Sequence, residues 1–151
     1  MSQPMGKPAL AESIFKQGFN CAQAVLAAYA DDLGLSEDTA LKIATGFGAG
    51  MGRAQEVCGA VSGAIMVVGL VDGRGKNDGR EKTEGTYRAV REFIDAFKKE
   101  HGTIICRELL PGCLLATAEG QAMFREQGLS AKCYGFVKTA CGLLDGRGDA
   151  S

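Results

Sequence analysis

The sequence predicts an all-α protein, a single-domain helical bundle of four to five main helices. Apolar residues recur at steps of three and four along several segments, which is the spacing of a buried helical face. No segment alternates between apolar and polar residues as a strand does, and no internal repeat is visible. The chain has 151 residues, a length that suits one domain with its own core. We therefore expect one helical domain over residues 1–151, with residues 1–7 and 145–151 disordered.

The first helical segment is expected within residues 8–33. Its apolar and small residues follow steps of three and four at Ile14, Gly18, Cys21 and Val25. This spacing predicts that Cys21 lies on or beside the buried stripe of the segment.

A shorter helix is expected next. Gly34 is placed to end the first segment, and Ser36 is predicted to be the N-cap of a helix that runs to Thr45. Residues 46–53, GFGAGMGR, then carry glycine at every second position. This run lacks the preceding strand of a dinucleotide fingerprint and the Lys-Ser/Thr ending of a Walker loop. We interpret it as a turn or a close backbone crossing, with an anion-binding nest of amides as the alternative.

Residues 56–70 are predicted to form a helix made largely of small residues. The small side chains recur at steps of three and four at Gly59, Ala60, Gly63 and Ala64. Each interior glycine costs roughly 1 kcal/mol of helix propensity, so a packing reason is expected for its presence. Small faces let neighbouring backbones approach closely, and they also allow a homodimer.

The second half of the chain begins with a polar, turn-rich stretch, residues 71–85, which predicts a long exposed loop. A strongly amphipathic helix follows, with inward-facing apolar positions over residues 87–97, and Gly102 ends it. Residues 103–110, TIICRELL, are expected to form a short helix. After a second loose region, Ser130 is predicted to cap the last helix.

Charge and hydropathy exclude two kinds of partner. Lys and Arg number 17 against 18 Asp and Glu, and the basic residues form no block, so we expect no nucleic-acid binding. The longest apolar run, residues 57–71, is interrupted by glycines and is shorter than the roughly 18–20 residues that cross a bilayer. The first residues lack the apolar core of a secretory signal. We therefore expect a cytoplasmic protein without membrane insertion.

Six cysteines are many for a chain whose thiols should stay reduced, and this abundance points to metal or redox chemistry. They are Cys21, Cys58, Cys106, Cys113, Cys133 and Cys141. No two form a CxxC pair, which excludes zinc-ribbon, thioredoxin-type and c-type haem motifs. Four of them fall in four different predicted helices, as when a bundle builds a site in its core, namely Cys21, Cys58, Cys106 and Cys133.

Cys58 and Cys106 are each predicted in the first turn of a helix, a position that lowers the pKa of a thiol. Arg53 lies upstream of Cys58, and Arg107 follows Cys106. Both placements favour the thiolate, which is the reactive and metal-ligating form. Two thiolates within reach cycle through a disulfide, whereas four that converge hold zinc or an iron–sulfur cluster. The residues alone leave both readings open.

Three other residues are expected to have structural roles. His101 ends the amphipathic helix and should interact favourably with the dipole at its carboxyl end. Glu56 is a stabilising acid in a first helical turn, and Cys141 is expected to pack in the core.

Several of these segments together resemble a known family. They are GFNCAQAVLAAYADDLGL, GFGAGMGRAQEVCGAVSGAIMVVGL, CRELLPGC and KCYGFV. In this order they resemble the family called C_GCAxxG_C_C, redox-active proteins with four cysteines, one of them in a CGAxxG motif. That motif is CGAVSG at residues 58–63 here, and the other three family cysteines map to Cys21, Cys106 and Cys133. The resemblance covers residues 14–144; it implies a redox role and brings no established substrate or cofactor.

The cysteine pattern and the resemblance together predict a cytoplasmic thiol redox protein. Cys58 is the expected primary thiolate, with Cys106, Cys133 and Cys21 as disulfide or relay partners and an unidentified redox partner. The alternative is a zinc or iron–sulfur protein that uses the same four cysteines as metal ligands. A third hypothesis is a non-catalytic helical interaction module whose cysteines only pack.

Overall fold

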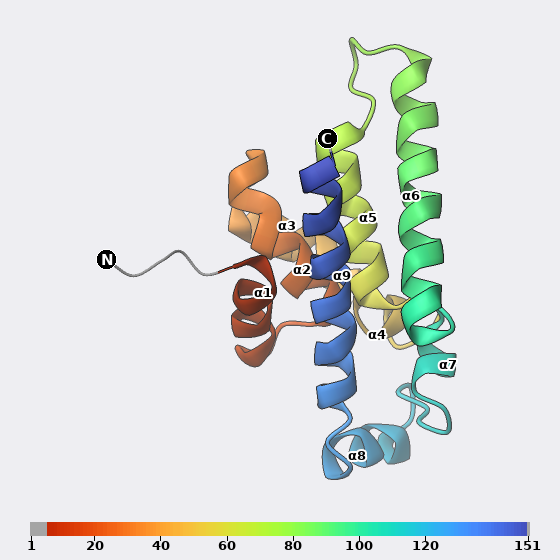
Figure 1. The fold of residues 1–151 in the computed structure, drawn as a ribbon. Helices are drawn as coiled ribbons and strands as arrows, with labels where there is room; N and C mark the ends of the chain where they lie inside the picture. The colour runs from red at the N-terminus through yellow and green to blue at the C-terminus, as the bar shows by residue number, and fades with distance from the viewer. Residues whose placement is uncertain (1–5, 151) are drawn as a thin grey trace.

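The computed structural model describes residues 6–150, with the side chains of residues 6–147 (Figure 1). Residues 1–5 and 151, part of the ranges expected to be disordered, lie outside the described residues. The described residues form helices and one isolated β-bridge, which confirms the all-α class. They form more helices than the four to five expected. The α-helices are α1 (Lys7–Lys16), α2 (Cys21–Ala30), α3 (Glu37–Ala44), α4 (Gly48–Met51), α5 (Gly59–Asp72), α6 (Arg80–His101), α7 (Cys106–Leu109), α8 (Ala118–Glu126) and α9 (Ser130–Ala150), with 3₁₀ turns η1 (Asp31–Leu33) and η2 (Thr45–Phe47).

The first predicted segment is two helices and not one. Helix α1 ends at Lys16, and Gly18 reverses the chain at a φ of +102°. Asn20 then caps α2 with a capping box, in which its side chain accepts from the Gln23 amide and the Gln23 side chain accepts from the Asn20 amide, both at 2.9 Å. The consequence is that Cys21 is the first residue of α2 and not a mid-helix position.

Two predicted helix ends are confirmed, whereas α5 begins at Gly59, three residues later than expected. Ser36 is the N-cap of α3, and Gly102 ends α6 in the left-handed conformation. Helix α6 begins at Arg80, so the exposed loop is shorter than expected. The short helix α7 has four residues, and the second loose region contains α8, which Thr117 caps by accepting from the Gly120 amide at 2.9 Å.

Helix α2 is the centre of the core. Residues 22–30 are all buried, and α2 contacts α1, α3, α5 and α9. Its closest neighbour is α5: a Cβ added at Gly63 would lie 2.8 Å from the carbonyl oxygen of Ala22. A Cβ added at Gly59 would lie 3.1 Å from the Ala22 amide nitrogen. The small residues of α5 therefore exist for close packing against α2, as the sequence indicated.

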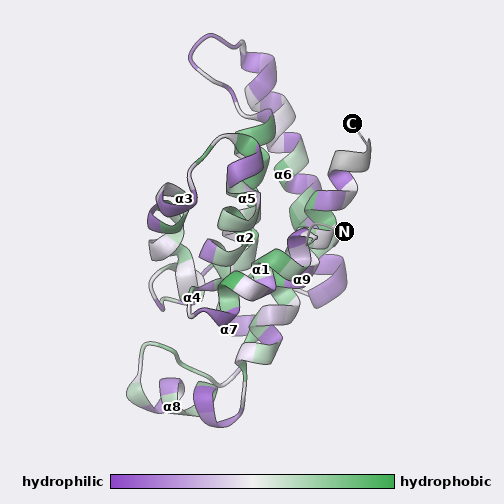
Figure 2. Cartoon of the chain, turned by 90° about the vertical axis from the view of Figure 1, so that its left-hand side faces the viewer, coloured by the Kyte–Doolittle hydropathy of each residue, from purple (hydrophilic) through white to green (hydrophobic). Residues whose placement is uncertain are grey.

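Helices α5, α6 and α9 run alongside one another, and α8 lies at one end of the molecule (Figure 1). The polar loop between α5 and α6 lies at the opposite end (Figure 2). Helix α9 continues through Ala150, and Tyr29 donates to the Asp145 carboxylate at 2.8 Å. Residues 145–150 are thus helical, which differs from the expected disorder. Among the described residues, no helix is both long enough and apolar enough to span a membrane.

Candidate functional site

One cavity of about 590 Å³ brings together the four cysteines that the sequence singled out. Cys21, Cys58, Cys106 and Cys133 all line it, and we refer to it as the thiol cavity. The rest of its wall is largely apolar, with four phenylalanines and three leucines: Phe15, Phe19, Phe124, Phe136, Leu109, Leu110 and Leu115. The predicted convergence of four helices on one site is therefore present.

All four cysteines lie where a helix begins. Cys21 is the first residue of α2, Cys58 is the N-cap of α5, and Cys106 is the first residue of α7. Cys133 lies in the first turn of α9. The thiol cavity is thus bordered by the amino-terminal ends of helices that are far apart in the sequence.

A short antiparallel bridge holds Cys58 and Cys106 together. Val57 pairs with Ile105. The Cys58 amide donates to the backbone carbonyl of Ile104 at 2.7 Å, and the Cys106 amide donates to the backbone carbonyl of Glu56 at 2.6 Å. Cys58 and Cys106 each follow directly after one residue of this bridge, and both line the thiol cavity. The bridge therefore positions both cysteines at the same cavity.

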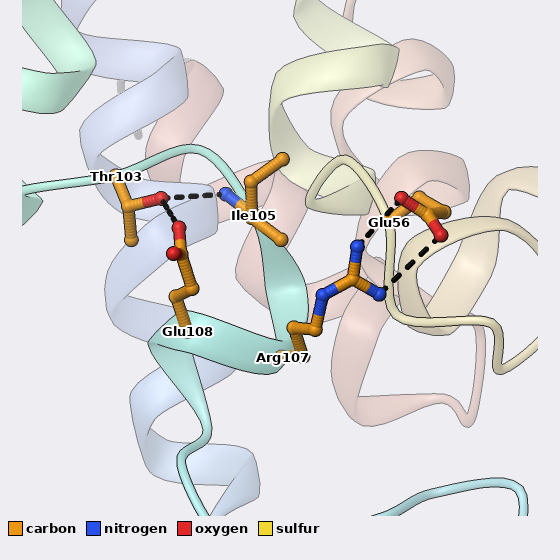
Figure 3. Close-up of polar contacts among 5 residues, drawn as sticks. All are labelled: Glu56, Thr103, Ile105, Arg107 and Glu108. Atoms are coloured by element: carbon orange, nitrogen blue, oxygen red, sulfur yellow. Dashed lines mark hydrogen bonds and ion pairs between the residues drawn. The ribbon is translucent and has the colours of Figure 1, made fainter.

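Polar contacts fix the bridge from its outer side (Figure 3). The Arg107 guanidinium donates to both oxygens of the Glu56 carboxylate, at 2.9 and 3.3 Å. Thr103 accepts from the Ile105 amide at 3.1 Å and donates to the Glu108 carboxylate. Arg107, expected to favour a thiolate at Cys106, is therefore paired with Glu56, which precedes the bridge and does not lie, as expected, in the first turn of a helix, since α5 begins at Gly59.

The glycine-rich run forms a left-handed turn against Cys106. Residues 49–53 all have positive φ, between +54° and +72°, and Gln55 follows at +56°. A Cβ added at Gly50 would lie 2.7 Å from the Cβ of Cys106. This confirms the interpretation of a close backbone crossing.

Gln55 is a buried polar residue behind Cys106 that sequence reasoning missed. Its side chain is buried, donates to the Cys113 carbonyl at 2.9 Å and accepts from the Leu115 amide at 2.9 Å. These bonds tie the turn to the loop after α7. Phe124 and Arg125 were also missed, because they lie on α8, which the sequence did not predict.

Burial governs the protonation of Cys58 and Cys106, which are 4% and 7% exposed. Burial raises the pKa of Cys58 to about 12, and the amides of Ala60 and Val61 offset only part of this. Burial likewise raises the pKa of Cys106 to about 11. The helix positions were expected to favour the thiolate at both residues; burial acts in the opposite direction, because desolvation disfavours the charged form.

Cys21 and Cys133 behave differently because their sulfurs interact. Hydrogen bonding with the Cys21 thiol lowers the pKa of Cys133. The same interaction, followed by burial, raises the pKa of Cys21. Both side chains are half-buried and line the thiol cavity. Cys133 is therefore the cavity sulfur best able to exist as a thiolate, with Cys21 as its donor.

The remaining cysteines lie outside the cavity lining. Cys113 is buried beside Leu110 and Leu115, and its sulfur donates to the Gly120 carbonyl at 3.2 Å. Cys141 is buried in the main core, and burial raises its pKa to about 12.

His101, the last residue of α6, lies outside the cavity lining as well. It packs against the rings of Phe97 and Phe136, and its ring hydrogen-bonds with the Thr139 hydroxyl at 2.9 Å.

The cavity cysteines have the chemistry of a metal site but not its geometry. All six cysteines are free thiols. In residues 6–147, no three His, Cys, Asp or Glu side chains converge as ligands of one ion. Four sulfurs about 2.3 Å from a zinc ion would require these helix ends to move together.

A helical fold in which four free thiols border one cavity defines the class of this molecule as an all-α thiol protein. Within that class, the chain belongs to the family described as "Putative redox-active protein (C_GCAxxG_C_C)", whose model matches residues 19–146. This span contains all four cavity cysteines and confirms the resemblance. No curated protein and no solved structure matches the chain.

Proposed function

We propose that the protein is a thiol redox protein that cycles between dithiol and disulfide in the thiol cavity. The observation that carries the proposal is the convergence of four free cysteines, each from a different helix start, on one cavity. Membership of a family described as redox-active supports the same chemistry.

The pair Cys21 and Cys133 is the first to be oxidised. The two sulfurs interact, and Cys133 has the lowered pKa that a nucleophilic thiol needs. In the oxidation, two thiols release two protons and pass two electrons to an acceptor as one disulfide forms. Cys58, the primary thiolate expected from the sequence, and Cys106 act as the second pair, because burial holds both protonated.

Differential alkylation tests the proposal. The reduced protein is treated with one equivalent of diamide, free thiols are blocked, and peptides are mapped by mass spectrometry. The expected product is a disulfide between Cys21 and Cys133, with Cys141 still a thiol as an internal control. Cavity cysteines that all remain free, or a disulfide that excludes both residues of this pair, would contradict it.

The metal-binding alternative stays a hypothesis with its own measurement. Protein prepared without oxygen is analysed for bound metal and for absorption above 300 nm. A stoichiometric metal that protects all four cavity cysteines from alkylation would replace the redox proposal.

A further inference from the structure

The charged side chains around the thiol cavity are all cationic. Lys16, Arg53 and Arg125 line it, and no described aspartate or glutamate does. They come from three separate elements, the end of α1, the left-handed turn and the last turn of α8. The rim is therefore positive, although the chain as a whole has a net charge of -1.

Among the described side chains, two of these cations have no acidic partner. Lys16 pairs with Glu12 at 2.8 Å. Among the side chains that the structure describes, Arg53 and Arg125 take part in no ion pair. An uncompensated guanidinium beside an apolar wall attracts carboxylates, which it binds through two parallel hydrogen bonds.

The size and wall of the cavity indicate a small organic ligand. A volume of about 590 Å³ lies within the roughly 300–1,000 Å³ of small-molecule sites. The phenylalanines and leucines of the wall suit an apolar body. Cys21 and Cys133 are half-buried and line the cavity, so a reacting sulfur enters the cavity to reach them.

We propose that the thiol cavity takes a low-molecular-weight disulfide that carries carboxylate groups, with Arg53 and Arg125 holding the carboxylates while the sulfurs meet Cys21 and Cys133. This proposal rests on the proposed function and names its substrate class. The three observations that support it are the cationic side chains of the lining, its apolar wall and the cysteines within it.

The reaction balances without a further reagent. The Cys133 thiolate attacks one sulfur of the substrate, so a mixed disulfide forms and one substrate thiolate leaves and takes up a proton. Cys21 then loses its proton and attacks the Cys133 sulfur, and the second substrate thiol leaves. The protein ends with a disulfide between Cys21 and Cys133, and the substrate gains two electrons and two protons.

Three disulfides of nearly equal length and different charge test the proposal. They are 3,3′-dithiodipropionate (two carboxylates), 2-hydroxyethyl disulfide (neutral) and cystamine (two ammonium groups). Oxidation of the reduced protein is followed in a single turnover, and each rate is divided by that of a free thiol such as N-acetylcysteine amide. The dianion is expected to react at least tenfold faster than the dication on this scale. The preference should shrink at 1 M salt, where the Debye length falls to about 3 Å.

Charge-removing variants locate the effect. Arg53→Gln with Arg125→Gln should remove most of the tenfold preference, whereas Arg88→Gln, an exposed cation on α6 outside the cavity lining, should leave it unchanged. Suberate, in which two methylenes replace the sulfurs of dithiodipropionate, should slow oxidation by competing for the cavity, and this binding is measurable by calorimetry without any redox step.

The outcomes separate the two proposals. If none of the three disulfides oxidises the cavity cysteines, the proposed function fails. If all three oxidise them at equal normalised rates, or the dication is fastest, the redox function stands and the anionic substrate class is overturned. If suberate neither binds nor slows oxidation, the anionic substrate class is overturned as well. This test uses the parent protein, so it does not depend on how the variants fold.

Discussion

Cys133 differs from the other cysteines of the thiol cavity in what its sulfur contacts. Hydrogen bonding with the Cys21 thiol lowers the pKa of Cys133, whereas burial is the main influence on the pKa of Cys58 and Cys106 and raises both. All four residues lie at helix starts, so helix position does not distinguish them. Burial and the neighbouring thiol therefore decide which cysteine ionises.

The order of thiol alkylation follows from this difference. At pH 7.5, iodoacetamide should label Cys133 at least tenfold faster than Cys58 or Cys106, because only Cys133 has a lowered pKa. Cys21→Ala should slow labelling of Cys133 by removing the donor, and Cys141→Ala should not. Time-resolved mass spectrometry measures these rates. Faster labelling of Cys58 would restore it as the primary thiolate.

The buried thiols predict a loss of stability in alkali. Burial raises the pKa of Cys58 and Cys141 to about 12 and that of Cys106 to about 11, from an ordinary 9.0. The folded state keeps these protons after the unfolded chain has released them. The free energy of unfolding should therefore fall as the pH rises from about 9 towards 12, by up to roughly 1.4 kcal/mol per pH unit for each thiol.

Urea unfolding between pH 8 and pH 10.5 measures this loss. Tyr29 adds to the loss only at the upper end of this range, because burial raises its pKa from an ordinary 10.0. Comparison with Cys141→Ala isolates one thiol, and this variant should lose stability less steeply than the parent protein. If the free energy of unfolding falls equally steeply with pH in both proteins, the folded state does not keep the Cys141 proton at alkaline pH.

At the scale of elements, the packing of α2 against α5 sets the position of two cavity cysteines. Gly59 and Gly63 contact the backbone of Ala22, and this contact holds Cys58 at the start of α5 near Cys21 at the start of α2. The cost of these glycines in helix propensity is thus offset by the close packing of the α5 backbone against the α2 backbone, which a larger residue would prevent.

Two glycines of α5 form a matched test of this packing. Gly63→Ala should destabilise the protein by about 1–3 kcal/mol, since its Cβ would lie 2.8 Å from the Ala22 carbonyl oxygen. Gly69→Ala, on the same helix with no atom within 4 Å of the added Cβ, should be neutral or stabilising by up to about 1 kcal/mol. Chemical denaturation measures both, and equal effects would contradict the packing argument.

The left-handed turn offers a second matched pair. Gly50 and Gly52 both have positive φ, at +66° and +64°, so alanine at either position carries a similar backbone penalty. Only at Gly50 would the new Cβ also press on Cys106 and on the Gln55 backbone, at 2.7 and 2.6 Å. Gly50→Ala should therefore change the alkylation rate of Cys106, while Gly52→Ala lowers stability without that change. If the alkylation rate of Cys106 is similar in both variants, the turn does not influence the thiol cavity.

At the scale of the whole molecule, oxidation of the thiol cavity would join distant parts of the chain. A disulfide between Cys21 and Cys133 links α2 to α9 and closes a loop of roughly 110 residues, for which chain entropy predicts a stabilisation of about 4–5 kcal/mol. The oxidised protein should therefore unfold at a higher urea concentration than the reduced protein. Cys21→Ser should abolish the difference, and a difference that persists in this variant would point to another disulfide.

The homodimer that the sequence allowed stays a prediction. The small residues of α5 that suggested it are buried against α2, so a dimer would need another surface. Solution scattering of the reduced protein measures the mass of the particle directly.

Local signals predicted much of this molecule. Ser36 and Gly102 mark helix ends by their own side-chain and backbone chemistry, and the cavity cysteines were selected by their separate predicted helices. The break before α2 was missed because its apolar spacing continues across residues 17–20, where the Asn20 capping box starts a new helix. Helix α8 was missed because the large apolar residues of AEGQAMFRE, Met123 and Phe124, are adjacent and do not recur at steps of three or four. Its contribution to the cavity comes from tertiary contact.

By itself, then, the sequence determined the all-α class, the small-residue helix and the set of four cysteines, because each depends on neighbours along the chain. Only the tertiary structure decided which sulfurs interact, which are buried and what charge surrounds them. A thiol's pKa depends on solvent exclusion and on groups that lie far away in the sequence, such as Cys21 beside Cys133. The same holds for the cationic rim, since Lys16, Arg53 and Arg125 meet only when α1, the turn and α8 are brought to one cavity.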